Sequence, residues 1–463
     1  MLAPNPLTDD ISSVRAQDTR RRRSIKLALG VCCALLLSVG AVGWLSESAI
    51  PWRHDIIIMA AILIFASTYA VIAIGKLPGF HLDRAGAALL GASLMAATGL
   101  VSLDDAYRAI DVDTIALLLG MMIVVANVRL SGFFRLVNNW MTMRARHPLL
   151  LLAAVTLVSG FFSAFLVNDA ICLVVTPLVL DCVTRLRRNP VPYLLAVAMA
   201  SNVGSTATIT GNPQNILIGS FSQIPYAAFS AALWPVAAAG LVLTVLLIAV
   251  CFPGEFWTRE RLRGQPESVR VHQPLMMKSL VVVLAMVTAY FAGQPPAKVA
   301  LIAGSVLLIT RRVKSEKVYQ QIDWPLLLMF MGLFVVVAGF EKAVLTPEAV
   351  RAVGSLHLDQ IPILSVITVG LSNLVSNVPA VLVLKPFVAN LPDPQRTWLA
   401  VAMSSTLAGN LTLVGSVANL IVVQVARARG VTIGFWEYTK VGAPLTVLTL
   451  LIGVLWLQAT GPN

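Results

Sequence analysis

The stretch Leu195-Ala-Val-Ala-Met-Ala-Ser201 returns almost unchanged as Leu399-Ala-Val-Ala-Met-Ser-Ser405, 204 positions further along the chain. Continued without gaps, the same offset pairs further polar and flexible positions: Thr208 with Thr412, Gly211 with Gly415, and Asn215 with Asn419. A repeated run of this kind indicates that the chain contains two related halves.

Two other matches lie in the same order along the chain. An offset of 209 pairs Ser163 with Ser372, Asn168 with Asn377 and Pro177 with Pro386. Upstream, the run from Asp111 to Ala126 matches the run from Asp323 to Ala338. One match could arise by chance, but three matches in one order predict an internal repeat.

The composition indicates that lipid is the main solvent of this chain. Of its 463 residues 57% are hydrophobic and only 12% are charged, and the mean hydropathy is +0.82. Soluble domains usually carry about a quarter charged residues. The net charge of +12 sits in short clusters between apolar runs, which is typical of membrane-protein loops and argues against a nucleic-acid partner.

The apolar runs predict an all-α polytopic membrane protein with about 11 transmembrane helices and two re-entrant hairpins. Uninterrupted runs lie near 25–45, 55–75, 85–101, 113–131, 229–252, 275–292, 297–310, 323–341 and 441–459. Four further runs contain Asn, Asp, Gly and Pro. We interpret 148–186 and 361–391 as hairpins, and 192–222 and 397–426 as helices broken in the middle.

The basic residues predict the orientation. With a cytoplasmic N-terminus, 27 of the 34 Lys and Arg residues fall on the inner side of this topology, and only six fall outside. The predicted order is a basic tail (1–26), a first span (27–54), repeat 1 (55–252), a cytoplasmic linker (253–274) and repeat 2 (275–459). We therefore expect an inner-membrane protein with its C-terminus outside. Each repeat has five spans, so the second copy is inverted.

Inverted repeats with broken helices at corresponding positions mark the binding sites of many secondary transporters. A break frees backbone groups that lipid cannot satisfy, so it persists only inside the protein or beside a wet cavity. Free N–H groups at half-helix N-termini suit an anion, and free carbonyls suit a cation. The candidate binding residues are Asn168, Asp169, Asn202, Thr208, Gly211, Asn212, Asn215, Ser376, Asn377, Lys385, Asn410, Thr412, Gly415, Ser416 and Asn419.

Two of these candidates are charged. Asp169 is the only acidic residue at a hairpin tip, where it could bind a cation, carry a proton or cap the second arm of its hairpin. Lys385 could attract an anion, replace a coupling cation or extend to the membrane surface. We expect no cofactor, and a coupling ion that is either sodium or a proton.

At these residues the chain resembles the ion transporter superfamily. That group includes divalent anion:sodium symporters, the membrane subunit of arsenite efflux pumps, NhaD-type sodium/proton antiporters and the pigmentation P protein. The run Thr208-x-x-Gly211-Asn212-Pro213-x-Asn215 is similar to the symporter signature Thr-x-x-Gly-Thr-Pro-x-Asn. The tip Val167-Asn168-Asp169 is more similar to the arsenite and P-protein branch.

The resemblance implies particular roles for the tips. In the symporters each tip reads Ser-Asn-Thr and holds a substrate carboxylate, a role that falls here on Asn168, Ser376 and Asn377. It also implies sodium sites near Asn168 and Asn212 and near Asn377 and Ser416, a homodimer, and an elevator movement. Val167, Asp169 and Val378 stand where the symporters have hydroxyls, which favours a smaller inorganic anion or oxyanion over a dicarboxylate.

Several functions remain open on the sequence. The first is secondary transport of a small anion; arsenite or antimonite efflux and sodium/proton exchange through Asp169 are variants. The sequence lacks a G-x-x-x-x-G-K-[ST] loop, so any use of ATP requires a separate ATPase. An intramembrane enzyme would need a nucleophile and base within the spans, and none is visible. An ion channel would show no stoichiometric coupling, and the paired hairpins favour alternating access instead.

Overall fold

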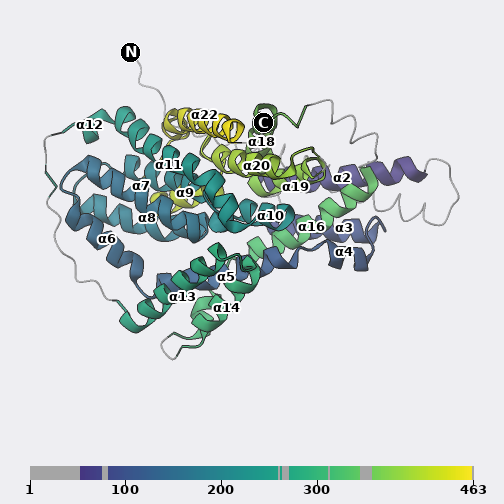
Figure 1. Cartoon of the computed structure of the whole chain (residues 1–463), viewed down its shortest axis with the longest axis horizontal. Coiled ribbons are helices and arrows are strands. Elements are labelled where there is room, and N and C mark those ends of the chain that lie inside the picture. The colour runs from purple at the N-terminus through teal and green to yellow at the C-terminus, as the bar shows by residue number, and fades with distance from the viewer. Residues whose placement is uncertain are drawn as a thin grey trace, which may run out of the picture. The chain divides into compact units, whose positions relative to one another are not determined.

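The computed structural model describes residues 53–75, 82–258, 261–262, 271–310, 313–344, 357–389 and 391–460. Every regular element in these ranges is a helix (Figure 1). The predicted basic tail and the predicted span at 25–45 lie outside the described residues. The chain is thus an all-helical polytopic membrane protein.

Seven helices in the described ranges are long and apolar enough to cross a membrane. Six of them occupy predicted uninterrupted spans: α2 (Arg53–Ile74), α5 (Val112–Leu130), α11 (Tyr226–Cys251), α13 (Gln273–Phe291), α16 (Trp324–Val344) and α22 (Phe435–Ala459). The seventh is α7 (Pro148–Phe165), the first arm of the first predicted hairpin. The predicted spans at 85–101 and 297–310 form shorter helices, the 14-residue α3 (Arg84–Ala97) and the 13-residue α14 (Pro296–Leu308).

The two halves of the chain repeat one order of helices. The first hairpin consists of α7 and α8 (Asn168–Arg185), and the second of α18 (Ile361–Val375) and α19 (Asn377–Val388). The first broken helix is α9 (Pro190–Ser205), a 3-10 turn η1 (Ile209–Gly211) and α10 (Pro213–Ser222); the second is α20 (Pro394–Ala408) and α21 (Val417–Arg427). Short connecting helices complete the chain: α4 (Leu103–Ala109), α6 (Phe133–Arg144), α12 (Pro253–Phe256) and α15 (Ser315–Tyr319).

Proline and short polar residues set where the broken helices begin. Pro190, Pro213 and Pro394 each occupy the first turn of a helix, where a missing N–H costs no hydrogen bond. The preceding Asn189, Asn212 and Asp393 accept hydrogen bonds from backbone N–H groups of that turn. The same chemistry therefore starts α9, α10 and α20 at fixed residues inside otherwise apolar runs.

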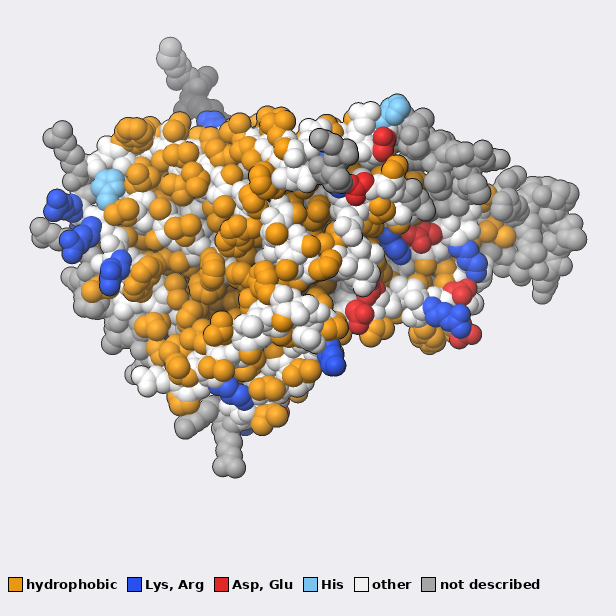
Figure 2. All heavy atoms as spheres, viewed as in Figure 1, with side chains coloured by type: hydrophobic (Ala, Val, Ile, Leu, Met, Phe, Trp, Pro, Cys, Tyr) orange, Lys and Arg blue, Asp and Glu red, His pale blue; other side chains and the backbone are white. Residues whose placement is uncertain are grey.

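The described helices form two compact units. One holds α2, α3, α4 and α16, and the other holds the remaining helices, including both hairpins and both broken helices. Within the second unit, α9 packs closely against α7 and α8, and α11 packs against α22 (Figure 1). Apolar side chains cover much of the visible surface (Figure 2), and α11 exposes Trp234, Val242, Leu246 and Val250, as expected for contact with lipid.

Each unit contains a helix pair that joins the two repeats through a glycine contact. In one unit α5 of repeat 1 lies against α14 of repeat 2, and a Cβ on Gly120 would lie 2.5 Å from the backbone carbon of Ala300. In the other, α16 of repeat 2 lies against α3 of repeat 1, and a Cβ on Gly332 would lie 2.6 Å from the backbone carbon of Ala88. The two contacts correspond in the repeat, because Gly120 matches Gly332 and Ala88 matches Ala300. In each contact a helix of one repeat packs against a helix of the other, so the two halves have exchanged these helices.

We predict that Gly120→Ala lowers the stability of the protein by about 1–3 kcal/mol, because the added methyl group forces α5 away from the backbone of α14. Thermal unfolding of the purified protein in detergent measures the change. Gly370→Ala on α18 is the control, since a Cβ there meets nothing within 4 Å and should leave stability equal or slightly higher. Equal effects of the two substitutions would contradict the close contact.

Candidate functional site

The first broken helix satisfies its own freed backbone groups with one amide. Beyond the end of α9, the Asn215 side chain donates to the carbonyl oxygens of Ser205 and Thr208, at 3.1 and 3.0 Å. Asn212 caps α10 by accepting from the backbone N–H of Asn215 at 2.8 Å. A Cβ on Gly211 would lie 2.2 Å from the Ser205 carbonyl oxygen, so only glycine fits at this turn. These side-chain and backbone contacts hold the break closed.

The second broken helix uses the same device 204 residues later. The Asn419 side chain donates to the carbonyl oxygens of Gly409 and Thr412, at 2.7 and 3.3 Å. Ser416 replaces Asn212 as the cap and accepts from the backbone N–H of Ala418. Gly415 again lies in the turn, where a Cβ would lie 3.0 Å from the Gly409 carbonyl oxygen. Both breaks therefore have one construction, and it depends on Asn215 and Asn419.

The two breaks meet through two reciprocal sets of side-chain hydrogen bonds. From the first half, Asn202 donates to Asn410 and Asn419 at 2.9 and 3.0 Å and accepts from Ser416 at 3.1 Å. From the second half, Thr406 bonds to Asn212, Gln214 and Asn215 at 3.1 to 3.3 Å. Thr406 is the repeat partner of Asn202. All these side chains are at most 5% exposed. We call this cluster the polar crossing.

The first hairpin tip is bonded to its neighbouring broken helix. The Asn168 side chain donates to Oδ1 of Asn202 at 3.1 Å, and Ser201 donates to the Asn168 carbonyl at 3.2 Å. Ser163 and Ser201 share a hydrogen bond of 2.8 Å, and Thr208 donates to the carbonyl of Ala164. These bonds place the tip directly beside the polar crossing.

The second hairpin tip makes only part of the corresponding set. Thr412 donates to Asn373 Oδ1 at 3.4 Å, which matches the contact of Thr208 with Ala164. Asn377 is 8% exposed, and its Oδ1 has no hydrogen-bond partner among the described residues. The hydroxyl of Ser372, the counterpart of Ser163, is equally unpartnered there. Ser376 adopts φ 81° and ψ 159°, a region that favours glycine, and this backbone turns the chain between the two arms.

The two charged candidates lie on the second arms of the two hairpins, Asp169 on α8 and Lys385 on α19. Asp169 lies in the first turn of α8, partly buried, with its backbone N–H donating to Asn168 Oδ1. The Lys385 ammonium lies 4.8 Å from the ring centroid of Phe221 on α10, in cation–π geometry.

The polar crossing brings together six predicted residues, namely Asn202, Asn212, Asn215, Asn410, Ser416 and Asn419. Gln214 and Thr406 also belong to the polar crossing, and Asn373 bonds to Thr412 beside the second break, but these three residues were not predicted. Thr406 could have been found, because it stands 204 residues after Asn202 in the repeat. Within the described residues, no group of three or more His, Cys, Asp or Glu side chains lies close enough together to hold a metal ion.

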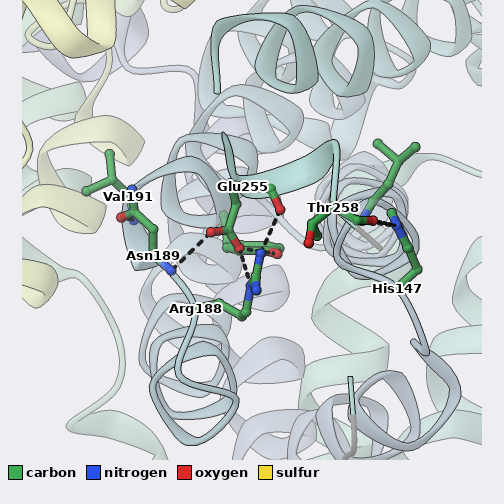
Figure 3. Close-up of polar contacts among 8 residues, drawn as sticks. His147, Arg188, Asn189, Val191, Glu255 and Thr258 are labelled. Carbon is green, nitrogen blue, oxygen red and sulfur yellow. Dashed lines mark hydrogen bonds and ion pairs between the residues drawn. The ribbon is translucent and has the colours of Figure 1, made fainter. Parts of the chain in front are cut away.

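At the base of the first hairpin, one carboxylate joins three segments (Figure 3). Glu255 on α12 accepts from Arg188 Nε at 2.7 Å, from the Tyr193 hydroxyl at 3.0 Å and from the backbone N–H of Asn189 at 3.4 Å. The side chains of Arg188 and Glu255 are only 11% and 10% exposed. The Glu255 cluster thus fixes the chain after α11 to the start of α9.

Comparison with known proteins identifies the family to which this chain belongs. Residues 69–404 match the family model described as citrate transporter. The chain belongs to the citrate transporter family. A 46 kDa membrane protein of Mycobacterium leprae is 32% identical over 429 residues, covering 86% of this chain and 98% of that protein. The silicon efflux transporter LSI3 of Oryza sativa subsp. japonica is 30% identical over 452 residues, covering 82% and 93%.

Other proteins that are similar to this member of the citrate transporter family are also named as transporters. A transporter named arsB from Dictyostelium discoideum is 26% identical and covers 88% of this chain and 92% of that protein. The crystal structure of the YdaH transporter of Alcanivorax borkumensis matches with a TM-score of 0.55 and 14% identity, covering 88% of this chain and 98% of that one. At that identity the match concerns the fold alone. The chain is a multi-pass membrane transporter.

We predict that Thr406→Val destabilises this family member by about 2–4 kcal/mol, because it leaves the buried amides of Asn212, Gln214 and Asn215 each short of one partner. Thermal unfolding in detergent measures the loss. Ser404→Ala on the same helix is the matched control, since the Ser404 hydroxyl is buried without a partner in the described residues. A loss as large in Ser404→Ala would show that the effect is not specific to the polar crossing.

We predict that Arg188→Met destabilises the protein by about 3–5 kcal/mol, because it leaves the buried Glu255 carboxylate without its cation. Asp181→Asn provides the control. Asp181 pairs with Arg429, but their side chains are 49% and 42% exposed, so we expect a change below about 1 kcal/mol. Urea unfolding followed by tryptophan fluorescence compares the two variants. Similar unfolding midpoints would contradict a stabilising role for the buried Glu255 cluster.

Proposed function

We propose that this protein is a secondary active transporter that moves a small anion or oxyanion across the inner membrane, coupled to sodium or protons. The observation that supports this most directly is the polar crossing. It gathers neutral amides and hydroxyls from both repeats at two helix breaks, beside the tip of the first hairpin. Neutral dipoles of this kind can replace the hydration shell of an ion without adding a fixed charge.

We also propose how these parts move during transport. In the proposed elevator movement, the hairpins, the broken helices, α11 and α22 move together relative to a scaffold. Their mutual hydrogen bonds, including the Glu255 cluster at the base, favour movement as one body. We further propose a homodimer with a cytoplasmic N-terminus and an external C-terminus. A relative of 32% identity, the inner membrane protein YbiR of Escherichia coli, supports the choice of membrane.

A second candidate is efflux of arsenite or antimonite, alone or with a separate ATPase. The similarity to the transporter named arsB and to the silicon efflux transporter LSI3 favours it. Sodium/proton exchange is the remaining variant. Asp169 supports this variant, because it is an acidic residue at the tip of the first hairpin. It lies beside Asn168, which bonds to the neighbouring broken helix.

Transport currents from proteoliposomes on a solid-supported membrane test the proposal. We expect a current that depends on one inorganic oxyanion and on either an imposed sodium gradient or an imposed pH gradient. If protons are the coupling ion, Asp169→Asn should reduce the current driven by a pH gradient at least tenfold, because an amide cannot carry the proton. Uptake of uncharged arsenous acid is measured chemically in parallel. Sodium and pH responses that no anion alters would instead identify an antiporter.

A further inference from the structure

The helix α6 has two apolar faces, and protein covers only one of them. On the covered face Phe134 and Met141 are buried, and α6 packs there against α5, α7 and α8. On the opposite face Leu136, Trp140 and Met143 are 41%, 55% and 47% exposed. Because these positions are four and three residues apart, they lie on one side of the helix. We call these three residues the α6 stripe.

The path of the chain places α6 along the membrane surface. With 12 residues it is about 18 Å long, whereas the hydrocarbon core of a bilayer is about 30 Å thick. In the proposed topology the preceding α5 ends on the cytoplasmic side, and the following hairpin of α7 and α8 begins on that same side. Both ends of α6 therefore lie at one face of the membrane, and the helix does not cross it.

Backbone hydrogen bonds hold both ends of α6 in place. Directly before the helix, the carbonyl of Ser131 accepts from the N–H of His272 at 3.0 Å. Shortly after it, the carbonyl of Arg146 accepts from the N–H of Leu262 at 2.9 Å. Both donors belong to the chain between α12 and α13. Together with the packing of the covered face, these bonds keep the α6 stripe turned outward.

Exposed arginines lie on both sides of the α6 stripe. Arg135 and Arg144 project from its two edges, as the helical spacing of 3.6 residues per turn requires. Arg146 and Arg261 are exposed nearby, since Arg261 precedes the residue that bonds to Arg146. None of these four forms an ion pair with the described residues.

The visible surface shows the same bias of charge. In Figure 2, Lys and Arg side chains gather at the end of the second unit where Figure 1 places α6, α8 and α12. No Asp or Glu side chain of the described residues is visible at that end. The surroundings of the α6 stripe are therefore basic, and a partner that covers the stripe must tolerate or neutralise positive charge.

An apolar stripe between arginines suits the surface of a bilayer that contains anionic lipids. The apolar side chains of an interfacial helix enter the boundary between headgroups and acyl chains, and its arginines reach the headgroup phosphates. Tryptophan, here Trp140, is enriched at that depth. The cytoplasmic leaflet carries a negative surface potential. A second copy of the chain, docked through the same face, would instead place Arg135 and Arg144 beside like charges.

We propose that the α6 stripe, with Arg135 and Arg144, is a binding surface for anionic phospholipids. The headgroup phosphates bond to the two guanidinium groups, and the acyl chains cover the apolar stripe. Because α6 connects α5 to the first hairpin, the bound lipid holds the start of that hairpin at the membrane surface. This inference goes beyond the proposed transport function and does not depend on which ion is moved.

Quenching of Trp140 fluorescence by brominated lipids tests the proposal. The full-length protein is placed in phosphatidylcholine nanodiscs that contain about 10% of either brominated phosphatidylglycerol or brominated phosphatidylcholine. Subtracting the signal of Trp140→Phe, measured in the same way, isolates the tryptophan on α6. We expect phosphatidylglycerol to quench this signal about threefold more strongly, because the arginines raise the local concentration of anionic lipid.

Two double variants of equal charge separate a specific surface from the net charge of the protein. Arg135→Gln with Arg144→Gln should bring the ratio of the two quenching values close to one, while quenching by brominated phosphatidylcholine persists. Arg108→Gln with Lys298→Gln removes two exposed charges elsewhere and should leave the ratio unchanged. Thermal unfolding in the same nanodiscs checks that both double variants are folded.

Three outcomes would overturn the proposal. The first is equal quenching of Trp140 by the two lipids in the unmodified protein, or a ratio that survives in Arg135→Gln with Arg144→Gln. The second is no quenching by either lipid, which would show that protein covers the stripe. The third is loss of the ratio on adding soluble glycerol phosphate, beyond the loss caused by sodium chloride of equal ionic strength, which would indicate a site for free phosphate.

Discussion

Two helices are interrupted inside an apolar protein, and every backbone group that the interruptions release must find a partner there. The chain meets this constraint with side-chain amides placed at equal positions in its two halves. Asn215 and Asn419 each bond two released carbonyls, and Asn202 and Thr406 then join one break to the other. The position of the first hairpin tip depends on this arrangement, because Asn168 bonds to Asn202. An unpaired amide at such a depth costs about 1–3 kcal/mol, so the breaks and their side chains cannot change independently.

The sequence predicted the all-helical membrane fold because this fold depends on local signals. Apolar runs, Pro and Asn at helix starts and the repeat offset are all visible in one chain. The exchange of α5 and α16 between the repeats was not predictable, since it rests on the contacts of Gly120 with Ala300 and of Gly332 with Ala88. Contacts between residues so far apart leave no periodic signal in a single sequence.

The candidate site was predicted in part for a similar reason. Residues that occupy matching positions in the repeat, such as Asn215 and Asn419, were visible from the alignment of the two halves. Thr406 was missed because a threonine within a helix usually bonds to its own backbone, and only the structure shows it bonded across to the other repeat. The role of Glu255 depends on a linker folding back over the base of a hairpin, which no local pattern indicates.

The exchanged helix pairs have a consequence for biosynthesis. α5 reaches its partner α14 only after about 170 further residues have been added, and α3 waits similarly for α16. At a synthesis rate of about 5–20 residues per second, α5 must remain in the bilayer for roughly 10–30 s without the neighbour that its glycine face fits. During that interval the glycine face around Gly120 lacks the α14 backbone that covers it in the folded protein. The exchange of helices thus means that the close packing of the first half is complete only after the second half has been synthesised.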